Sequence, residues 1–158
     1  MKLVALHRQY PGTWCLVPIV LDRVRAMSAE YGDPGDVELL CQSIEAGFMA
    51  ANPLVVALAV VDETEVIGHL VMSFDMWLGH SYVTVVQYSL DRPVSRGFAD
   101  EQRQAIEKWA ASRGAKEIRA IVGGPHAAGL ERAYRVFHGF RRLKVVVGKS
   151  LATGSEEK

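Results

Sequence analysis

Residues 54–90 read LVVALAVVDETEVIGHLVMSFDMWLGHSYVTVVQYSL. The first part, 54–61, is almost continuously apolar, which is typical of a strand buried on both faces. An acidic turn at 62–65 separates it from a second strand at 66–77, and a third strand follows at 82–90. The sequence therefore predicts a meander of antiparallel strands at the centre of the molecule.

Amphipathic helices are expected on the N-terminal side of this meander. Apolar residues recur at helical spacing over 16–31 and again over 33–48, and Gly32 separates the two stretches as a helix stop. A short apolar run at 2–6 is suited to a further strand. The first third of the chain is therefore expected to supply one strand and two helices.

The C-terminal side of the meander alternates between helical and strand patterns. We expect a loop, a helix, a strand, a second helix and a last strand, over 91–99, 98–113, 117–122, 127–137 and 140–151 respectively. The whole order is β-α-α-β-β-β-α-β-α-β. It forms one domain spanning 1–151, followed by a polar tail at 152–158 that we expect to be flexible.

Composition excludes several classes of protein. The chain has 158 residues, with 18 Lys plus Arg, 18 Asp plus Glu and 49% hydrophobic residues, which is ordinary for a globular domain and too apolar for a disordered chain. A net charge of zero offers no positive excess for sequence-independent nucleic-acid binding. No apolar stretch reaches the ~18 residues of a membrane-spanning helix, and the N-terminus lacks a secretory signal. We therefore expect a cytoplasmic protein without nucleic-acid or membrane partners.

The cysteines and histidines show no metal-binding pattern. Cys15 and Cys41 have neither metal-ligand spacing nor a disulfide framework, and both stand among apolar residues. We therefore expect two reduced, buried thiols. His126 and His138 are too isolated in the sequence to suggest a metal ion, so no metal cofactor is predicted.

Three segments of the second half carry a resemblance to a known family. Residues 93–101 read PVSRGFADE, residues 106–118 read IEKWAASRGAKEI and residues 133–140 read AYRVFHGF. With the element order, they resemble the GCN5-related N-acetyltransferase (GNAT) family, whose signature Pro-x-x-Arg-Gly-x-Gly-x-Gly joins a strand to a helix. The resemblance covers roughly residues 54–151. It implies an α+β (α/β) fold with a mixed, mostly antiparallel sheet flanked by about four helices.

The resemblance also implies a cofactor and its site. Members of the family transfer an acetyl group from acetyl-coenzyme A to an amine, and the loop before the helix wraps the cofactor's pyrophosphate. Unpaired backbone N–H groups and the positive end of the helix dipole suit such an anion. The pantetheine arm is expected between the strands at 82–90 and 117–122. The cofactor-binding residues implied here are Gln87, Ser89, Leu90, Arg92, Arg96, Gly97, Phe98, Ala99 and Asp100.

The signature departs from the family at its end. Ala99 replaces a Gly, and Asp100 and Glu101 bring two carboxylates to the place where the family holds a pyrophosphate. Two unit charges ~4 Å apart repel by about 1 kcal/mol in water and about 4 kcal/mol at an effective dielectric constant of 20. Either the acids open the helix with no phosphate nearby, or their side chains turn outward and the phosphate still binds. In the second case Arg92 and Arg96 offset the acids.

The expected general acid is displaced as well. In the family it is a Tyr that protonates the departing thiolate, and Tyr134 lies one residue further from Phe140 than the family's spacing requires. One residue turns a helix face by about 100°. Tyr134 is therefore either the general acid or a core aromatic, and His126 is the substitute. Candidate general bases, each of which is otherwise a solvated or merely hydrogen-bonded side chain, are His69, Asp75 and His80.

Two functions stay open at this point. The first is an acetyltransferase that uses acetyl-coenzyme A and acts on a small-molecule or protein amine. The second is a catalytically inert module of the same fold, such as a tailed-phage virion protein, that has lost coenzyme A binding. The apolar residues of 72–78 alternate at strand spacing. They predict a buried face, the lining of an acceptor cleft, or a contact within a homodimer or an assembly.

Overall fold

A five-stranded sheet forms the centre of the computed structural model, within the residues that it describes, 1–31 and 37–121. The elements are β1 (Lys2–Ala5), α1 (Leu16–Tyr31), α2 (Val37–Met49), β2 (Val55–Asp62), β3 (Glu65–Trp77), β4 (His80–Leu90), α3 (Arg96–Ser112) and β5 (Glu117–Ala120). This order confirms the first eight elements of the expected succession. The helix expected at 127–137, the strand at 140–151 and the tail at 152–158 lie outside the described residues.

The strands follow the chain across the sheet in the order β1-β2-β3-β4-β5. β1 to β4 pair antiparallel, which confirms the meander, whereas β5 pairs parallel with β4. A parallel pair needs a crossover connection, and α3 provides it. β3 and β4 are joined by a tight turn in which Leu78 and Gly79 have φ values of 49° and 75°, as a two-residue hairpin loop requires.

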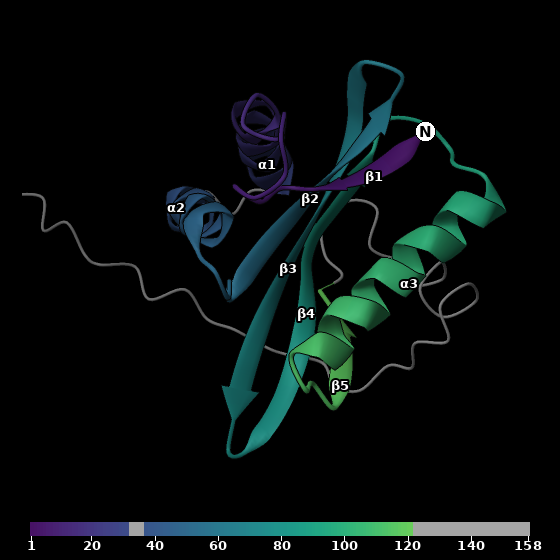
Figure 1. Cartoon of the computed structure of the whole chain (residues 1–158). Coiled ribbons are helices and arrows are strands. Elements are labelled where there is room, and N and C mark those ends of the chain that lie inside the picture. Colours follow the sequence, from purple (N-terminus) through teal and green to yellow (C-terminus); the bar gives the residue numbers. More distant parts are fainter. Residues whose placement is uncertain (32–36, 122–158) are drawn as a thin grey trace, which may run out of the picture.

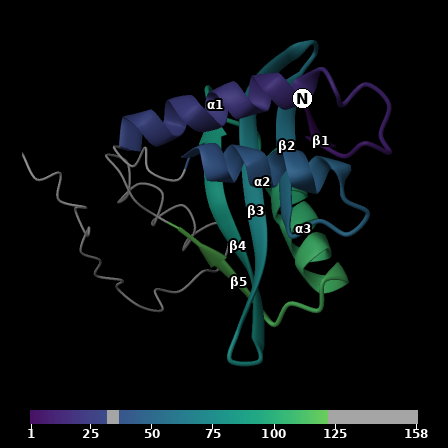
Figure 2. The same ribbon diagram turned by 90° about the vertical axis from the view of Figure 1, so that its left-hand side faces the viewer.

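Helices cover both faces of the sheet. α1 and α2 lie on one face, and α3 crosses the other (Figure 1, Figure 2). The core on the first face includes Val20, Val24, Ile44, Phe48, Ala59 and Val71. The core on the α3 face includes Leu58, Leu70, Met72, Val83 and Val85. The side chains of β2 alternate between these two cores, which explains why its sequence is continuously apolar.

Two local expectations are wrong. α3 begins at Arg96 rather than at residue 98, because Ser95 caps it with its side chain. Cys15 is exposed, whereas Cys41 is buried as expected. The apolar residues beside Cys15 in the sequence therefore did not predict its exposure. Cys15 precedes the first residue of α1 and lies in a surface turn.

The apolar alternation of 72–78 is buried only at its start. Met72 is 1% exposed, whereas Met76 and Leu78 are 68% and 91% exposed. The end of the β3–β4 hairpin extends beyond the helices on both faces (Figure 1), so nothing among the described residues covers its tip. The expectation of one continuous buried face is therefore wrong for the second half of this segment.

The described residues contain neither a helix suited to a membrane nor a cluster suited to a metal ion. Over 1–31 and 37–121, no helix has both the length and the apolar character needed to cross a membrane. In the same ranges, no three His, Cys, Asp or Glu side chains are grouped so that they could hold a metal ion.

Candidate active site at the open edge of strand β4

One edge of β4 is paired over only part of its length. β5 pairs with it from Tyr82 to Val85, and the Ile121 N–H donates to the Val85 carbonyl oxygen at 3.1 Å. Among the described residues, nothing pairs with that edge over 86–90, which we call the open edge. Backbone N–H and C=O groups along such an edge can bind another extended chain. The expected cofactor residues on it are Gln87, Ser89 and Leu90.

A β-bulge lies where the open edge begins. Val71 of β3 pairs with Gln87, whereas the next residue, Met72, pairs with Val85. Val86 is therefore an extra residue on β4. Bulges bend a strand and re-aim its side chains, and they are frequent beside active sites. The β4 side chains that pack toward α3 are accordingly Val83 and Val85 before the bulge and Tyr88 and Leu90 after it.

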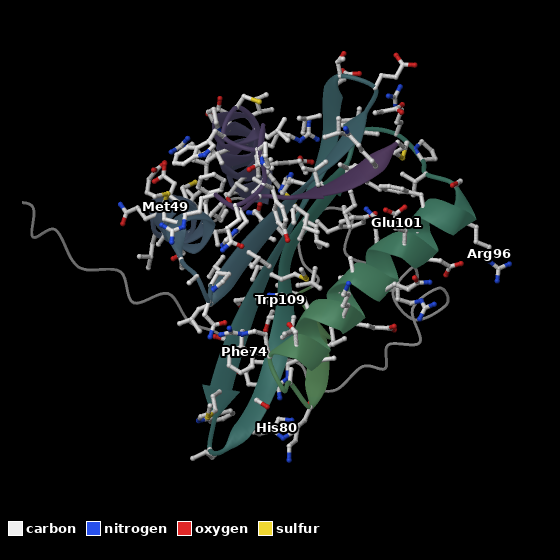
Figure 3. All side chains as sticks on the ribbon, in the orientation of Figure 1. Met49, Phe74, His80, Arg96, Glu101 and Trp109 are labelled. Carbon is white, nitrogen blue, oxygen red and sulfur yellow. The ribbon has the colours of Figure 1, made fainter. Side chains whose placement is uncertain are left out.

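The loop after β4 leads to the N-terminus of α3. The Ser95 hydroxyl accepts a hydrogen bond from the Phe98 N–H at 3.2 Å. Arg96 and Gly97 occupy the first helical positions, both are exposed, and the first turn holds no acidic residue. Their N–H groups have no partner within the helix, and no carboxylate offsets the positive end of the dipole. The first turn is therefore suited to an anion, and the Arg96 side chain reaches into solvent beside it (Figure 3).

The two acids of the signature lie beyond this first turn. The Ala99 N–H already donates to the Ser95 carbonyl oxygen at 3.0 Å, so the residues after it belong to the regular helix. The Asp100 carboxylate lies 3.7 Å from Arg103 and its side chain is 49% exposed, and Glu101 is exposed. Of the two alternatives raised by the sequence, this arrangement agrees with acids whose side chains turn outward.

Two of the expected cofactor residues have other partners. The Arg92 guanidinium donates to the Asp62 carboxylate at 2.6 Å, at the β2–β3 turn. The Phe98 side chain is buried with Val60 and Ile67. Only the backbone of Phe98 could therefore contact a ligand at the N-terminus of α3. The Arg92 side chain is thus paired with the last residue of β2. Arg96 is exposed at the first position of α3.

A buried polar chain lies behind the open edge, on the side of α1. His69 of β3 is fully buried, and its Nε2 lies 3.1 Å from the Gln87 Oε1. The Gln87 Nε2 in turn donates to the Ser28 hydroxyl of α1 at 2.8 Å. Burial lowers the pKa of His69 from 6.5 to about 4. His69 is therefore enclosed and a weak base, which makes it unsuitable as the general base that the sequence suggested.

A second polar contact lies on the other side of the open edge, under α3. The Tyr88 hydroxyl donates to the Gln102 Oε1 at 2.8 Å, and burial raises the pKa of Tyr88. Gln102 is 4% exposed, and its Nε2 has no partner among the described residues. A buried donor without an acceptor is costly. The pair therefore leaves an amide donor unsatisfied beside the open edge.

The other candidate bases lie toward the β3–β4 hairpin. His80 lies at the hairpin end of the sheet (Figure 3), and its Nε2 is 3.1 Å from the Glu117 Oε2. The Ser73 hydroxyl donates to Asp75 at 2.7 Å. A hydrogen bond from Arg119 lowers the pKa of Glu117. His80 and Asp75 are exposed, which agrees with the alternative of solvated, hydrogen-bonded side chains.

Sequence reasoning did not find two residues of this region, Ser28 and Gln102. Ser28 lies 59 positions from its partner Gln87, and Gln102 lies 14 positions from Tyr88. No local pattern reports such pairs, because they are made by packing of a helix on the sheet. The candidate general acids Tyr134 and His126 lie outside the described residues and stay predictions.

Comparison with known proteins identifies the fold. No family model matches the sequence, and no curated protein matches it. An integron cassette protein from the mobile metagenome of Cole Harbour Salt Marsh aligns with a TM-score of 0.64 and 17% identity, over 97% of this chain and 92% of its own. An aminoglycoside acetyltransferase from an uncultured soil metagenomic sample aligns with a TM-score of 0.65 and 13% identity, over 94% and 96%.

A third structure is crystallised with the cofactor. The aminoglycoside N-acetyltransferase AAC(6')-Iy in complex with CoA aligns with a TM-score of 0.64 and 15% identity, over 94% of this chain and 93% of its own. The chain therefore has the acyl-CoA N-acyltransferase fold of the GNAT family, as the resemblance implied. At these identities the likeness establishes the fold, and the activity has to be argued from the site.

Proposed function

We propose that the protein is an N-acetyltransferase that moves an acetyl group from acetyl-coenzyme A to a small-molecule amine. The observation that carries the proposal is the continuity between the open edge of β4 and the acid-free first turn of α3. Coenzyme A has an extended pantetheine arm with amide groups, followed by a pyrophosphate. The arm would pair with the open edge, and the pyrophosphate would bind at the first turn of α3, which follows the open edge along the chain. An enzyme of the same fold is crystallised with CoA, which supports the proposal.

The first turn of α3 fits the pyrophosphate. A Cβ at Gly97 would meet nothing within 4 Å, so the backbone there is open to close approach by a ligand. The N–H groups of Arg96 and Gly97 would donate to phosphate oxygens, and the Arg96 guanidinium would add a charge. Arg92 is held by Asp62 and is not part of this set.

The open edge fits the pantetheine arm. Its five residues, 86–90, span about 17 Å at the rise of a strand. Alternate residues of an edge strand direct their N–H and C=O groups outward. The Asp91 N–H donates to the Ile67 carbonyl oxygen of β3, so by alternation the backbone groups of Ser89 and Gln87 also face β3. The arm's amides would therefore pair with the backbone of Leu90 and Tyr88, as an added strand does. Specific side chains are not needed for this pairing, which is why the polar side chain of Gln87 can point elsewhere.

The acceptor and the acid complete the proposal. The cofactor would supply a thioester. As the C–N bond to the amine forms, the C–S bond at the carbonyl carbon would break, the amine nitrogen would lose a proton to water, and the departing thiolate would gain one. Tyr134, with His126 as the substitute, is our candidate for that proton donor. An acetyltransferase of the same fold is crystallised with sisomicin, which favours a small-molecule amine over a protein acceptor here.

Gly97→Ala is expected to raise the stability of the protein and to weaken the binding of coenzyme A. Ala at an exposed helical position that a Gly occupied stabilises a fold by roughly 0.5–1 kcal/mol. The added methyl group stands between the backbone and a phosphate, so we expect the Kd for coenzyme A to rise about tenfold or more. Thermal unfolding and isothermal titration calorimetry with coenzyme A measure the two effects.

Ser112→Ala is the matched control, since it raises helix propensity at the opposite end of α3. It should leave the Kd for coenzyme A unchanged. An unchanged Kd in Gly97→Ala would show that no phosphate approaches the first turn, and the site would have to be sought elsewhere. An absence of binding by the wild type would favour the inert module.

A further inference from the structure

The Gln87 side chain is held at both ends of its amide. Its Nε2 donates to Ser28 of α1 at 2.8 Å, and its Oε1 lies 3.1 Å from the His69 Nε2. Because the Gln87 Nε2 is the donor to Ser28, its Oε1 is the acceptor toward His69. The imidazole therefore carries its proton on Nε2, and Nδ1 is a bare nitrogen that has no partner among the described residues.

This chain of hydrogen bonds joins three elements at one point of β4. Gln87 follows the extra residue, Val86, and stands where the pairing of β4 with β5 has just ended. A bulged strand has lost part of its ladder, and an edge strand is paired on one side only. The backbone around Gln87 is thus less constrained than the stretch from Tyr82 to Val85, which is paired on both sides. The side-chain hydrogen bonds of Gln87 add a constraint at this point.

We propose that His69 is a positioning residue, which through Gln87 holds β4 in the bulged conformation that presents the open edge to the acyl-coenzyme A arm. The inference rests on the proposed function for its ligand. His69 touches neither cofactor nor substrate in this account. It is fully buried and acts through the orientation of Gln87, while Ser28 ties the same amide to α1.

The position of the network favours this role over simple packing. An apolar residue at 69 would fill the core between α1 and β3 equally well, as Val71 does on the same face. A buried His with an unpartnered Nδ1 is costly by comparison. The only side-chain hydrogen bond that His69 forms among the described residues goes to Gln87, the residue after the bulge.

The test compares His69→Leu with Val24→Ala. Leu keeps apolar volume at position 69 but removes the donor to Gln87. Val24→Ala removes volume from the same core, at a site that is likewise fully buried, and its side chain has no hydrogen-bonding group that could take part in the network. The first measurement is amide hydrogen exchange of residues 86–90 without cofactor. The second is the Kd for acetyl-coenzyme A, well below the unfolding midpoint of each variant.

We expect His69→Leu to exchange at 86–90 about tenfold faster or more than the wild type, and to bind acetyl-coenzyme A about tenfold more weakly or worse. Val24→Ala should match the wild type within about twofold in both. His69→Gln, which restores an N–H donor, should recover most of the binding. Ser28→Ala should show a weaker form of the same defect, and it serves as the second variant if His69→Leu does not fold.

Equal exchange at 86–90 in His69→Leu and the wild type would overturn the inference, as would equal defects in His69→Leu and Val24→Ala. Faster exchange without a change in Kd would also overturn it, because the edge would then not depend on the network for binding. These results are distinct from failure of the proposed function, in which the wild type itself does not bind acetyl-coenzyme A.

Discussion

Gly47→Ala is expected to destabilise the protein by about 3 kcal/mol or more, because among the described glycines it is the one where an added Cβ would come nearest to another atom. A Cβ at position 47 would lie well inside van der Waals contact with the backbone carbonyl oxygen of Val55. Gly47 lies in the last turn of α2, and Val55 is the first residue of β2. The neighbouring atom is backbone rather than a flexible side chain, so α2 would have to move away from the sheet.

Urea unfolding of Gly47→Ala measures this effect. The control is Gly97→Ala, which adds the same methyl group to another helical glycine where nothing lies within 4 Å. The control should be as stable as the wild type or more so. A loss below about 1 kcal/mol in Gly47→Ala would contradict the close packing of α2 on β2.

The second large effect is a loss of stability in mild acid. The pKa of His69 is about 4 in the folded protein against an ordinary value of 6.5. Between these values the unfolded chain binds the proton more readily than the folded one, so stability falls as the pH drops from 6.5 to 4 and is constant above that range. From pH 8 to pH 5 the expected loss is about 2 kcal/mol, approaching about 3 kcal/mol near pH 4.

The difference between the wild type and His69→Leu isolates this loss. Urea unfolding at pH 8 and pH 5 should show the decrease in the wild type but not in His69→Leu, and every other titrating group cancels in the comparison. Asp91 and Glu117 have pKa values lowered from 3.8 and 4.5, so their contributions are lost mainly below this window. The same decrease in both proteins would show that His69 is not the group responsible.

The bulge in β4 could have been predicted from the sequence. Val83 and Val85 set an alternation on odd positions, whereas Tyr88 and Leu90 continue it on even positions. A strand with period two cannot change phase unless it gains a residue. All four side chains pack toward α3, so the break in phase marks the bulge and the beginning of the open edge.

The start of α3 was misplaced for a different reason. The resemblance to the family's signature placed Arg96 and Gly97 in the loop before the helix. Ser95, however, is a good N-cap residue by its chemistry alone. The shift moves Asp100 and Glu101 out of the first turn, which removes the main conflict between the sequence and an anion site. The capping preference of Ser95 therefore predicts the start of α3 better than the signature does.

Other features could not be obtained from local patterns. The bond between Gln87 and Ser28, and the bond that turns Arg92 toward Asp62, join segments 59 and 30 positions apart. Both depend on how a helix or hairpin packs on the sheet, which periodicity does not report. The strands themselves were predictable from the sequence. Their side chains pack into the core on one face of the sheet or into the cores on both faces, and this gives each strand an apolar pattern.

We propose above that the open edge of β4 and the first turn of α3 bind acetyl-coenzyme A. Thermal unfolding with and without millimolar acetyl-coenzyme A tests it most directly, with ATP as a polyphosphate control. A ligand at 100 times its Kd adds about 2.7 kcal/mol, which raises the midpoint of a chain of this size by about 5–10 °C. We expect such a shift with acetyl-coenzyme A and a much smaller one with ATP. No shift, or an equal shift with both, would contradict a coenzyme A site and point to the inert module.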